Sequence, residues 1–273
     1  MKIKDHFLSQ EEFEIVETST KGVYKTSPIP SNIGKYYESE NYISHHQDSG
    51  SLKERVYKFL QSFNLKYKKN ILIERIPKQA KVMDYGCGAG EFVKYIENDF
   101  EAIGFEPDYD ARSAAQSKVS KAKIIADATT IEDKSLDAIT LWHVFEHIEN
   151  QEEILNLFHS KLKENGLLII AVPNPTSYDA KYYKEYWAAY DVPRHIFHFS
   201  KNGMINLFES KRDWKLRKIK PLLLDSFYIS LLSEKYKKSP LFWLKAPIVG
   251  LISNVKASIS NEYSSLIYII EKK

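Results

Sequence analysis

The sequence predicts an α/β domain with a doubly wound, mostly parallel sheet. One observation is the alternation, between residues 80 and 172, of short apolar runs of strand length with single helical patterns. Strands joined through single helices make right-handed crossovers, which place the strands parallel in one sheet. A second observation is the glycine-rich turn DYGCGAG, residues 84–90, which follows the first of these runs. In such a sheet, ligands bind at the carboxyl ends of the strands, so the residues after each strand are the candidates for chemistry.

The sequence predicts the following helices and strands in chain order. EFEIVE and GVYKT predict a hairpin, and a capping box from Ser51 to Glu54 begins a helix whose apolar residues recur at helical spacing. Asn150 is expected to cap a later helix and Gly166 to end it. The alternating part consists of strand AKVMDYG, helix EFVKYIEN, strand FEAIGFE, helix DYDARSAAQSK, strands KIIAD and LDAITLW, helix NQEEILNLFHSKLKENG and strand GLLIIAVP. WKLRKIK and SSLIYIIEKK predict the last two strands.

The composition excludes several classes of protein. The 273 residues are 43% hydrophobic, enough for a sizeable core, and a formal charge of +3 is too small to indicate nucleic acid as the main partner. One cysteine allows no internal disulfide, and the first residues lack the apolar core of a secretory signal, so a cytoplasmic protein is expected.

The most apolar stretch, PLFWLKAPIVGLI at 240–252, is shorter than the roughly 18 residues of a membrane span. It is interrupted by Lys245 and Pro247, and packing in the core is the expected role. Contact with a membrane surface remains an alternative for this stretch.

The residues after the first three strands indicate a cationic nucleoside as ligand. Gly86, Gly88 and Gly90 permit a tight turn and a close approach of the backbone to a ligand. Asp84 at this turn would repel a pyrophosphate and suit positive charge instead. Glu106, after the second strand, is placed to accept the hydroxyls of a ribose. Asp127, after the third strand, is placed to meet an adenine amino group.

With these residues, the segments VMDYGCGAGEF, IGFEPD, IIADATT and LDAITLWHVFEHI resemble the motifs of class I S-adenosylmethionine-dependent methyltransferases over residues 80–175. The resemblance implies a Rossmann-like, seven-stranded sheet and S-adenosylmethionine as cofactor. It further implies that the three glycines border the methionine part, with Asp84 near its ammonium group and Glu106 on the ribose. The predicted cofactor site also contains Tyr85, Cys87, Pro107, Asp127 and Ala128, together with His143, which with Trp142 replaces the usual acidic residue after the fourth strand.

A competing pattern is HVFEH, residues 143–147, which matches the H-x-x-E-H of inverted zinc peptidases. That chemistry needs both histidines one turn apart on a helix and a further ligand. Here the pattern begins at the end of a predicted strand, so no metal is predicted. A zinc hydrolase and a non-catalytic S-adenosylmethionine-binding protein remain the alternative functions.

The segment WAAYDVPRHIFHFS, residues 187–200, follows the fifth strand and is similar to the W-x(3)-D-x-P-R-H-x(2)-H-F-S segment of methyltransferases related to the ubiquinone-biosynthesis O-methyltransferases. Long loops at this end of a sheet are usually functional. Methyl transfer to a hydroxyl needs a base, for which histidine suits neutral pH. His195 or His198 is the predicted base, and Asp191 or Arg194 would orient it or the acceptor. Alternatively, Asp191 and Arg194 pair only to fix the loop.

The chain therefore divides into four parts. Residues 1–47 would form an N-terminal extension and lid, with Tyr37, Tyr42 and His45 as candidates for its wall. Residues 48–221 would form the cofactor-binding core with the acceptor loop 173–200, followed by a helical insertion at 222–262 and the last strand at 263–273. The expected partner is a small-molecule acceptor that offers oxygen or nitrogen, and the protein is expected to be a monomer or homodimer.

Overall fold

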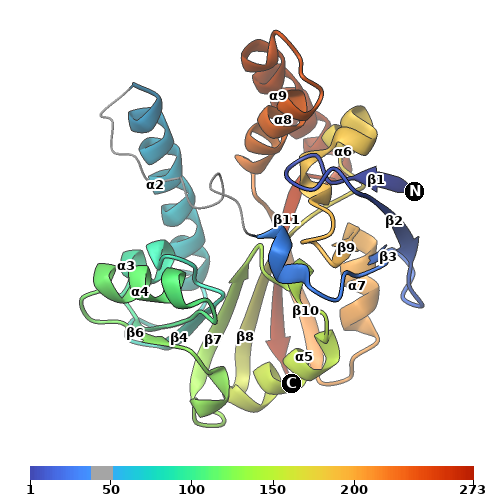
Figure 1. The fold of residues 1–273 in the computed structure, drawn as a ribbon. Helices are drawn as coiled ribbons and strands as arrows, with labels where there is room; N and C mark the ends of the chain where they lie inside the picture. The colour runs from blue at the N-terminus through green and yellow to red at the C-terminus, as the bar shows by residue number, and fades with distance from the viewer. Residues whose placement is uncertain (38–51) are drawn as a thin grey trace.

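The computed structural model describes residues 1–37 and 52–273 and has two sheets (Figure 1). The main sheet has seven strands in the order β10-β11-β8-β7-β4-β5-β6. These are β4 (Lys81–Tyr85), β5 (Glu101–Phe105), β6 (Lys123–Ile125), β7 (Leu136–Trp142), β8 (Leu162–Pro173), β10 (Trp214–Pro221) and β11 (Ser265–Lys272). β11 runs antiparallel to both its neighbours, while β4 to β8 are parallel. The predicted mostly parallel, seven-stranded sheet is thus confirmed.

Helices cover this sheet. They are α2 (Leu52–Ile73), α3 (Glu91–Ile96), α4 (Tyr109–Lys118), α5 (Gln151–Lys161) and α7 (Lys201–Glu209). Polar side chains begin most of them: Asn150 caps α5 through Glu153 N, and Ser200 caps α7 through Gly203 N. The Ser51 end of the predicted capping box lies outside the described residues. β4 and β7 are neighbours from which the chain leaves in opposite directions across the sheet, so a crevice is expected at their carboxyl ends.

The prediction that Gly166 ends a helix is wrong. α5 ends at Lys161, and β8 begins at Leu162. Leu162 already pairs with Leu136 of β7, and a register shift lies between this pair and the next one, Ala138 with Leu167. The glycine therefore lies in an irregular part of a strand. Sequence spacing could not show this, because Leu162 belongs to the strand through its pairing with Leu136 of β7, which is distant in the sequence.

The N-terminal segment forms a second, antiparallel sheet in the order β1-β2-β3-β9. β1 (Lys2–Lys4), β2 (Glu12–Glu17) and β3 (Val23–Ser27) come from the N-terminus, and the predicted hairpin is confirmed as β2 and β3. β9 (Phe197–Phe199) comes from the loop after β8, and Tyr24 of β3 pairs with His198. The N-terminal segment and the acceptor loop are therefore one structural unit.

A buried arginine joins the two parts of this unit. The Arg194 guanidinium donates to Asp5 Oδ1 at 3.0 Å, to both carboxylate oxygens of Asp191, and to the backbone oxygen of Tyr36 at 3.0 Å. Arg194 and Asp5 are both 1% exposed. Because each guanidinium nitrogen donates to an oxygen and two carboxylates lie against the cation, the buried charges are compensated.

The remaining helices lie beyond the sheet and in the acceptor loop. α6 (Tyr178–Tyr183) follows β8, and α8 (Asp225–Tyr236) and α9 (Phe242–Ser260) form a helical hairpin between β10 and β11. Short 3-10 turns are η1 (Ile33–Tyr36), η2 (Ala128–Thr130), η3 (Phe145–His147), η4 (Lys184–Tyr186) and η5 (Ala188–Tyr190). Figure 1 shows the α8–α9 pair projecting away from the main sheet. In the part of the chain that the structure describes, no helix is both long and apolar enough to cross a bilayer.

Replacing Arg194 with methionine should lower the free energy of unfolding by about 3–5 kcal/mol, because Asp5 would be left buried without its cation. Urea unfolding followed by circular dichroism measures this. Arg217→Met is the matched control. Arg217 lies on the edge strand β10 and makes an exposed ion pair with Glu271 of β11. Equal, small effects of both changes would show that Arg194 does not hold the N-terminal segment to the acceptor loop.

Candidate active site

The glycine turn after β4 has the backbone conformation that the sequence predicts. Gly86, Gly88 and Gly90 have φ angles of 74°, 53° and 78°, a region that residues with a Cβ rarely adopt. A Cβ on Gly86 would lie 2.7 Å from a methyl group of Val144, and one on Gly90 would lie 2.9 Å from Ala115. A Cβ on Gly88 would enter open space. The outer two glycines therefore serve close packing, and Gly88 leaves room for a ligand.

This turn borders a cavity of about 250 Å³. Its walls come from the glycine turn, from β4 and β7, and from one face each of α2 and α3. The lining residues are Gln61, Asn64, Leu65, Lys68, Asp84, Gly86, Cys87, Gly88, Glu91, Phe92 and Trp142. Four of the residues predicted to bind the cofactor, namely Asp84, Gly86, Cys87 and Gly88, thus lie on this cavity.

The Asp84 carboxyl is the acidic group of the cavity. It is 3% exposed and accepts a hydrogen bond of 2.6 Å from Thr140 Oγ1 on β7. Burial raises the pKa of Asp84 to about 7, although the Thr140 hydrogen bond and the Lys68 charge act in the opposite direction. A buried carboxyl with a raised pKa gains stabilisation from a cationic ligand, because a positive charge beside it favours its ionised form.

Glu106 connects the glycine turn to the end of β5. Its Oε2 accepts a hydrogen bond of 2.8 Å from Gly88 N, and its Oε1 accepts one of 3.0 Å from Asp108 N. The carboxylate thus lies beside the cavity and fixes the conformation of the turn. Each carboxylate oxygen has a second lone pair, so contact with a ribose hydroxyl stays compatible with these bonds.

Tyr85, Pro107, Asp127 and Ala128, which are also predicted to contact the cofactor, do not line the cavity. Asp127 is exposed and accepts hydrogen bonds from the amide and hydroxyl of Thr129, so its side chain caps η2. Ala128 is buried, Pro107 is exposed, and Tyr85 stacks on Phe105 with ring centroids 4.3 Å apart. On the cavity wall itself, burial raises the pKa of the Cys87 thiol to about 12. Contacts of these residues with a cofactor stay a prediction.

His143 stands at the carboxyl end of β7 with a positive φ of 58°. Its Nε2 donates to Asp225 Oδ2 of α8 at 2.8 Å, and its Nδ1 donates to Glu146 Oε1 at 3.3 Å. Burial opposes the charged ring, but the two carboxylates raise the pKa of His143 to about 10. The ring is therefore an imidazolium at neutral pH and links the base of the α8–α9 hairpin to the sheet.

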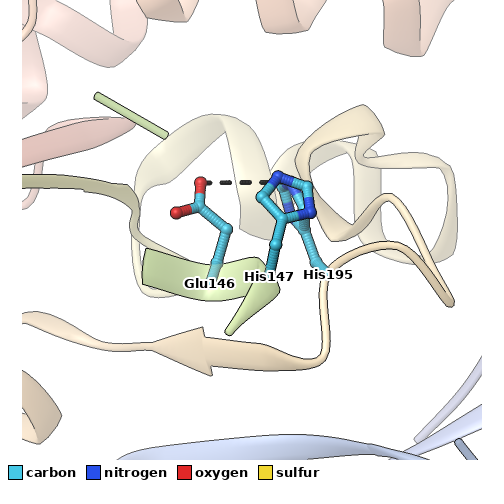
Figure 2. A group of neighbouring side chains, drawn as sticks. All are labelled: Glu146, His147 and His195. Atoms are coloured by element: carbon cyan, nitrogen blue, oxygen red, sulfur yellow. Dashed lines mark ion pairs between the residues drawn. The ribbon is translucent and has the colours of Figure 1, made fainter. Parts of the chain in front are cut away.

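Glu146 and His195 face each other beside this link (Figure 2). His195 Nδ1 donates to the backbone oxygen of Ala189 at 2.9 Å, which leaves Nε2 with a lone pair. Nε2 lies 3.9 Å from Glu146 Oε1. Burial lowers the pKa of His195 to about 4, so its ring is neutral at neutral pH.

The Glu146 carboxylate is ionised although it is buried. Burial opposes its ionisation, but the hydrogen bond from His143 and the nearby imidazoles lower the pKa of Glu146 to about 2. Its Oε2 is buried and has no hydrogen-bond partner among the described residues. The other oxygen, Oε1, accepts from His143 and lies 3.9 Å from His195 Nε2, so two hydrogen-bond acceptors face each other there.

The remaining predicted catalytic residues have structural partners. Thr26 Oγ1 donates to the backbone oxygen of His195 at 2.7 Å, so at 2.9 Å the same oxygen can only accept from His198 Nε2. Burial lowers the pKa of His198 to about 3. Asp191 and Arg194 form the ion pair that fixes the loop, and Asp191 Oδ2 also lies 4.0 Å from His195 Nε2.

The zinc-peptidase interpretation of HVFEH is not supported by this geometry. His143 directly follows the last residue of β7, and Glu146 and His147 lie in the short turn η3, so the two histidines do not share an α-helix. Among the described residues, a different group could hold a metal ion: Glu146, His147 and His195, whose ligand atoms lie within 4.8 Å of one another. The absence of a metal stays a prediction.

Sequence reasoning missed Lys68 and the face of α2 to which it belongs. Gln61, Asn64, Leu65 and Lys68 recur at helical spacing and line the cavity. Burial lowers the pKa of Lys68, while Asp84 and Asp225 act to raise it. The spacing alone gave no signal, because it does not show which side of a helix faces a ligand.

Comparison with known proteins agrees with this geometry. The methyltransferase-domain family matches residues 54–218 of the chain. The chain belongs to this family. Binding of S-adenosylmethionine is typical of the family, and the resemblance to class I methyltransferases is confirmed.

Individual relatives are distant. An uncharacterised protein of Methanocaldococcus jannaschii is 30% identical over 60% of this chain and 65% of its own length. The ubiquinone biosynthesis O-methyltransferase of Bradyrhizobium diazoefficiens is 26% identical over 40% of this chain and 46% of its own. These matches thus span less than two thirds of the relatives' lengths.

The fold has relatives among solved structures. A methyltransferase of Thermotoga maritima, described as a possible histamine N-methyltransferase, superposes with a TM-score of 0.53 at 14% identity. The superposition covers 81% of this chain and 95% of the other. At this identity the likeness shows the fold alone.

Binding of S-adenosylhomocysteine should strengthen as the pH rises through 7. At pH 6 Asp84 is mostly protonated and neutral, whereas at pH 8 it is mostly ionised and would attract the ammonium group that is predicted to lie beside it. Affinity measured by calorimetry should rise about tenfold between these values. In Asp84→Asn the rise should disappear, and any titration of the ligand itself remains visible in this variant as a control. A pH profile unchanged by the substitution would contradict a role for Asp84 at the ammonium group.

Proposed function

We propose that this protein transfers the methyl group of S-adenosylmethionine to a hydroxyl oxygen of a small molecule, with His195 as the general base. Membership of the methyltransferase family and the cavity beside the glycine turn support the first part. The Glu146 carboxylate, whose Oε1 lies 3.9 Å from the lone pair of His195 Nε2, supports the second. A relative named as an O-methyltransferase supports oxygen as the acceptor atom, with nitrogen as the alternative.

The Glu146–His195 pair suits the capture of a proton. The carbonyl of Ala189 fixes the proton of neutral His195 on Nδ1, so Nε2 is the basic nitrogen. When Nε2 takes up a proton, the two facing acceptors become a donor and an acceptor, and the imidazolium is stabilised by the carboxylate. The carboxylate thus favours the protonated ring and offsets part of the burial that lowers the pKa of His195 to about 4.

The methyl transfer needs a donor, a base and a dry site. Bound S-adenosylmethionine supplies a methyl group on a positively charged sulfur. The acceptor oxygen forms the new bond to the methyl carbon, the carbon–sulfur bond breaks, and the hydroxyl proton goes to His195 Nε2. The aromatic side chains near this nitrogen, Trp187 and Phe197 among them, leave no space for a water molecule. The acceptor enters only when these side chains separate, and their closure keeps water out.

His195→Asn should lower the turnover number by about 100-fold or more, because a general base contributes about that much. Asparagine keeps a donor near the Nδ1 position for the Ala189 carbonyl but has no basic nitrogen. His198→Gln is the matched control, since glutamine can still donate to Thr26 from the Nε2 position, and its turnover should stay near that of the wild type. Turnover is measured at saturating cofactor in the presence of a chelator.

The opposite result, loss of turnover in His198→Gln alone, would make His198 the base. Near-normal turnover in both variants would remove histidine from the reaction. Loss of wild-type activity in the chelator, restored by a divalent cation, would assign Glu146, His147 and His195 to a metal ion instead of proton transfer.

Lys68 is proposed to bind the carboxylate of the methionine part. Its ammonium group lines the cavity with Asp84 and lies 4.6 Å from the ring centroid of Trp142. Asp84 and Lys68 thus present opposite charges to one cavity. The ammonium and carboxylate groups of an amino acid carry the complementary pair of charges.

Lys68→Ala should weaken S-adenosylmethionine binding by about tenfold to a hundredfold, the usual contribution of a charge-assisted hydrogen bond. Decarboxylated S-adenosylmethionine should bind the variant and the wild type equally well. Lys66→Ala, an exposed position on the same helix, is the control. An equal loss for both ligands would show that Lys68 does not contact the carboxylate.

A further inference from the structure

α9 has two apolar faces, of which one is buried. The buried face consists of small residues and packs on α8 and α6: Ala246, Val249, Gly250, Ser253 and Ala257. The opposite face consists of larger aliphatic side chains, and all of them are exposed. These are Leu244, Ile248, Leu251, Ile252, Val255 and Ile259. An ordinary amphipathic helix would carry polar residues on that outer face.

Specific contacts fix which face of α9 points outward. A Cβ on Gly250 would lie 2.8 Å from the Phe227 ring of α8, so the two helices approach closely there. Ser253 Oγ donates to the buried Asp179 carboxylate of α6 at 2.7 Å. A rotation of α9 about its axis would break both contacts. The outward position of the aliphatic face therefore follows from the packing. The sequence prediction that this stretch packs in the core agrees with the burial of Ala246 and Val249, but it is wrong for the larger side chains of the outer face.

The exposed charged side chains around this face are all positive. Between Ser226 and Asn261 the chain has five lysines and one acidic residue, Glu234. Glu234 is only 2% exposed, whereas Lys235, Lys237, Lys238, Lys245 and Lys256 are all exposed. Lys245 and Lys256 are about three helical turns apart and flank the aliphatic face on one side. The hairpin thus presents an apolar strip with a cationic border.

We propose that the α8–α9 hairpin docks on the surface of an anionic lipid bilayer, with α9 lying in the plane of the interface. An aliphatic face with lysines at its margin is the composition that binds such surfaces. Trp243, 61% exposed at the start of α9, has the side chain preferred at the level of the lipid headgroups. A second copy of the chain is a poorer occupant, because it would bring the same lysines and no exposed acidic residue from its hairpin to pair with them.

Docking would bring the candidate active site to the membrane. α8 begins at Asp225, whose carboxylate holds His143 at the end of β7. The base of the hairpin is therefore part of the site. If the proposed methyl transfer is correct, a lipid-linked acceptor fits this arrangement. The docking proposal itself is based only on the residues of the hairpin.

The test is sedimentation of the full chain with vesicles. Wild type should bind vesicles of phosphatidylcholine mixed with phosphatidylglycerol, more weakly at high salt, and should bind pure phosphatidylcholine poorly. Ile248→Gln with Val255→Gln should lower binding by about tenfold for each side chain. Val16→Gln, an exposed apolar position on β2, should leave binding unchanged. Unaltered S-adenosylhomocysteine affinity shows that each variant is folded.

Tryptophan fluorescence gives an independent readout. Trp187 and Trp214 are buried and Trp142 is half-buried, so a blue shift on vesicle binding should come from Trp243. Trp243→Phe should still sediment with anionic vesicles but lose the shift. No sedimentation of the wild type would overturn the proposal. So would a concentration-dependent dimer that the Ile248, Val255 double variant abolishes in the absence of lipid binding.

Discussion

The candidate site depends on one buried, ionised carboxylate, that of Glu146. Taking such a charge out of water is costly unless cations and donors surround it. Here His143 supplies the positive charge, and His195 faces the carboxylate from the acceptor loop. The backbone oxygen of Glu146 accepts a hydrogen bond from Ile196 N, so η3 and the acceptor loop are also joined at Glu146. Charge balance and chain position thus depend on the same residue.

The acceptor loop owes its shape to the N-terminal segment. Thr26 of β3 bonds to both His195 and His198, and Asp5 compensates the charge of Arg194. Without these partners, the polar side chains of the loop would be buried without hydrogen bonds, or would turn to solvent. The N-terminal segment therefore acts first as a scaffold that orients histidines. A further role as a lid over the cofactor stays a prediction for residues 1–47.

A second buried carboxylate, Asp179 of α6, plays the same part at the helical hairpin. It accepts from Trp187 of the acceptor loop, from Ser253 of α9 and from Ser264 just before β11. Three segments that are distant in sequence are thereby held in one orientation. The outward aliphatic face of α9 follows from this orientation, because the helix can satisfy Asp179 and fit against Phe227 on only one side. The exposed apolar strip is a consequence of polar contacts on the opposite face.

By itself, the sequence determined the sheet and the order of its elements, and it predicted the cofactor end of the site. Strand and helix periods are local, and the glycines and acids at strand ends follow directly from them, so Asp84, Gly88 and Glu106 could be proposed as cofactor residues from the sequence alone. Only the tertiary structure decided the rest. The tautomers of His195 and His198 depend on Ala189 and Thr26, the charge of His143 depends on Asp225, and Lys68 reaches the cavity through the placement of α2. These properties arise from contacts between segments far apart in the chain, and no local pattern encodes which groups will meet.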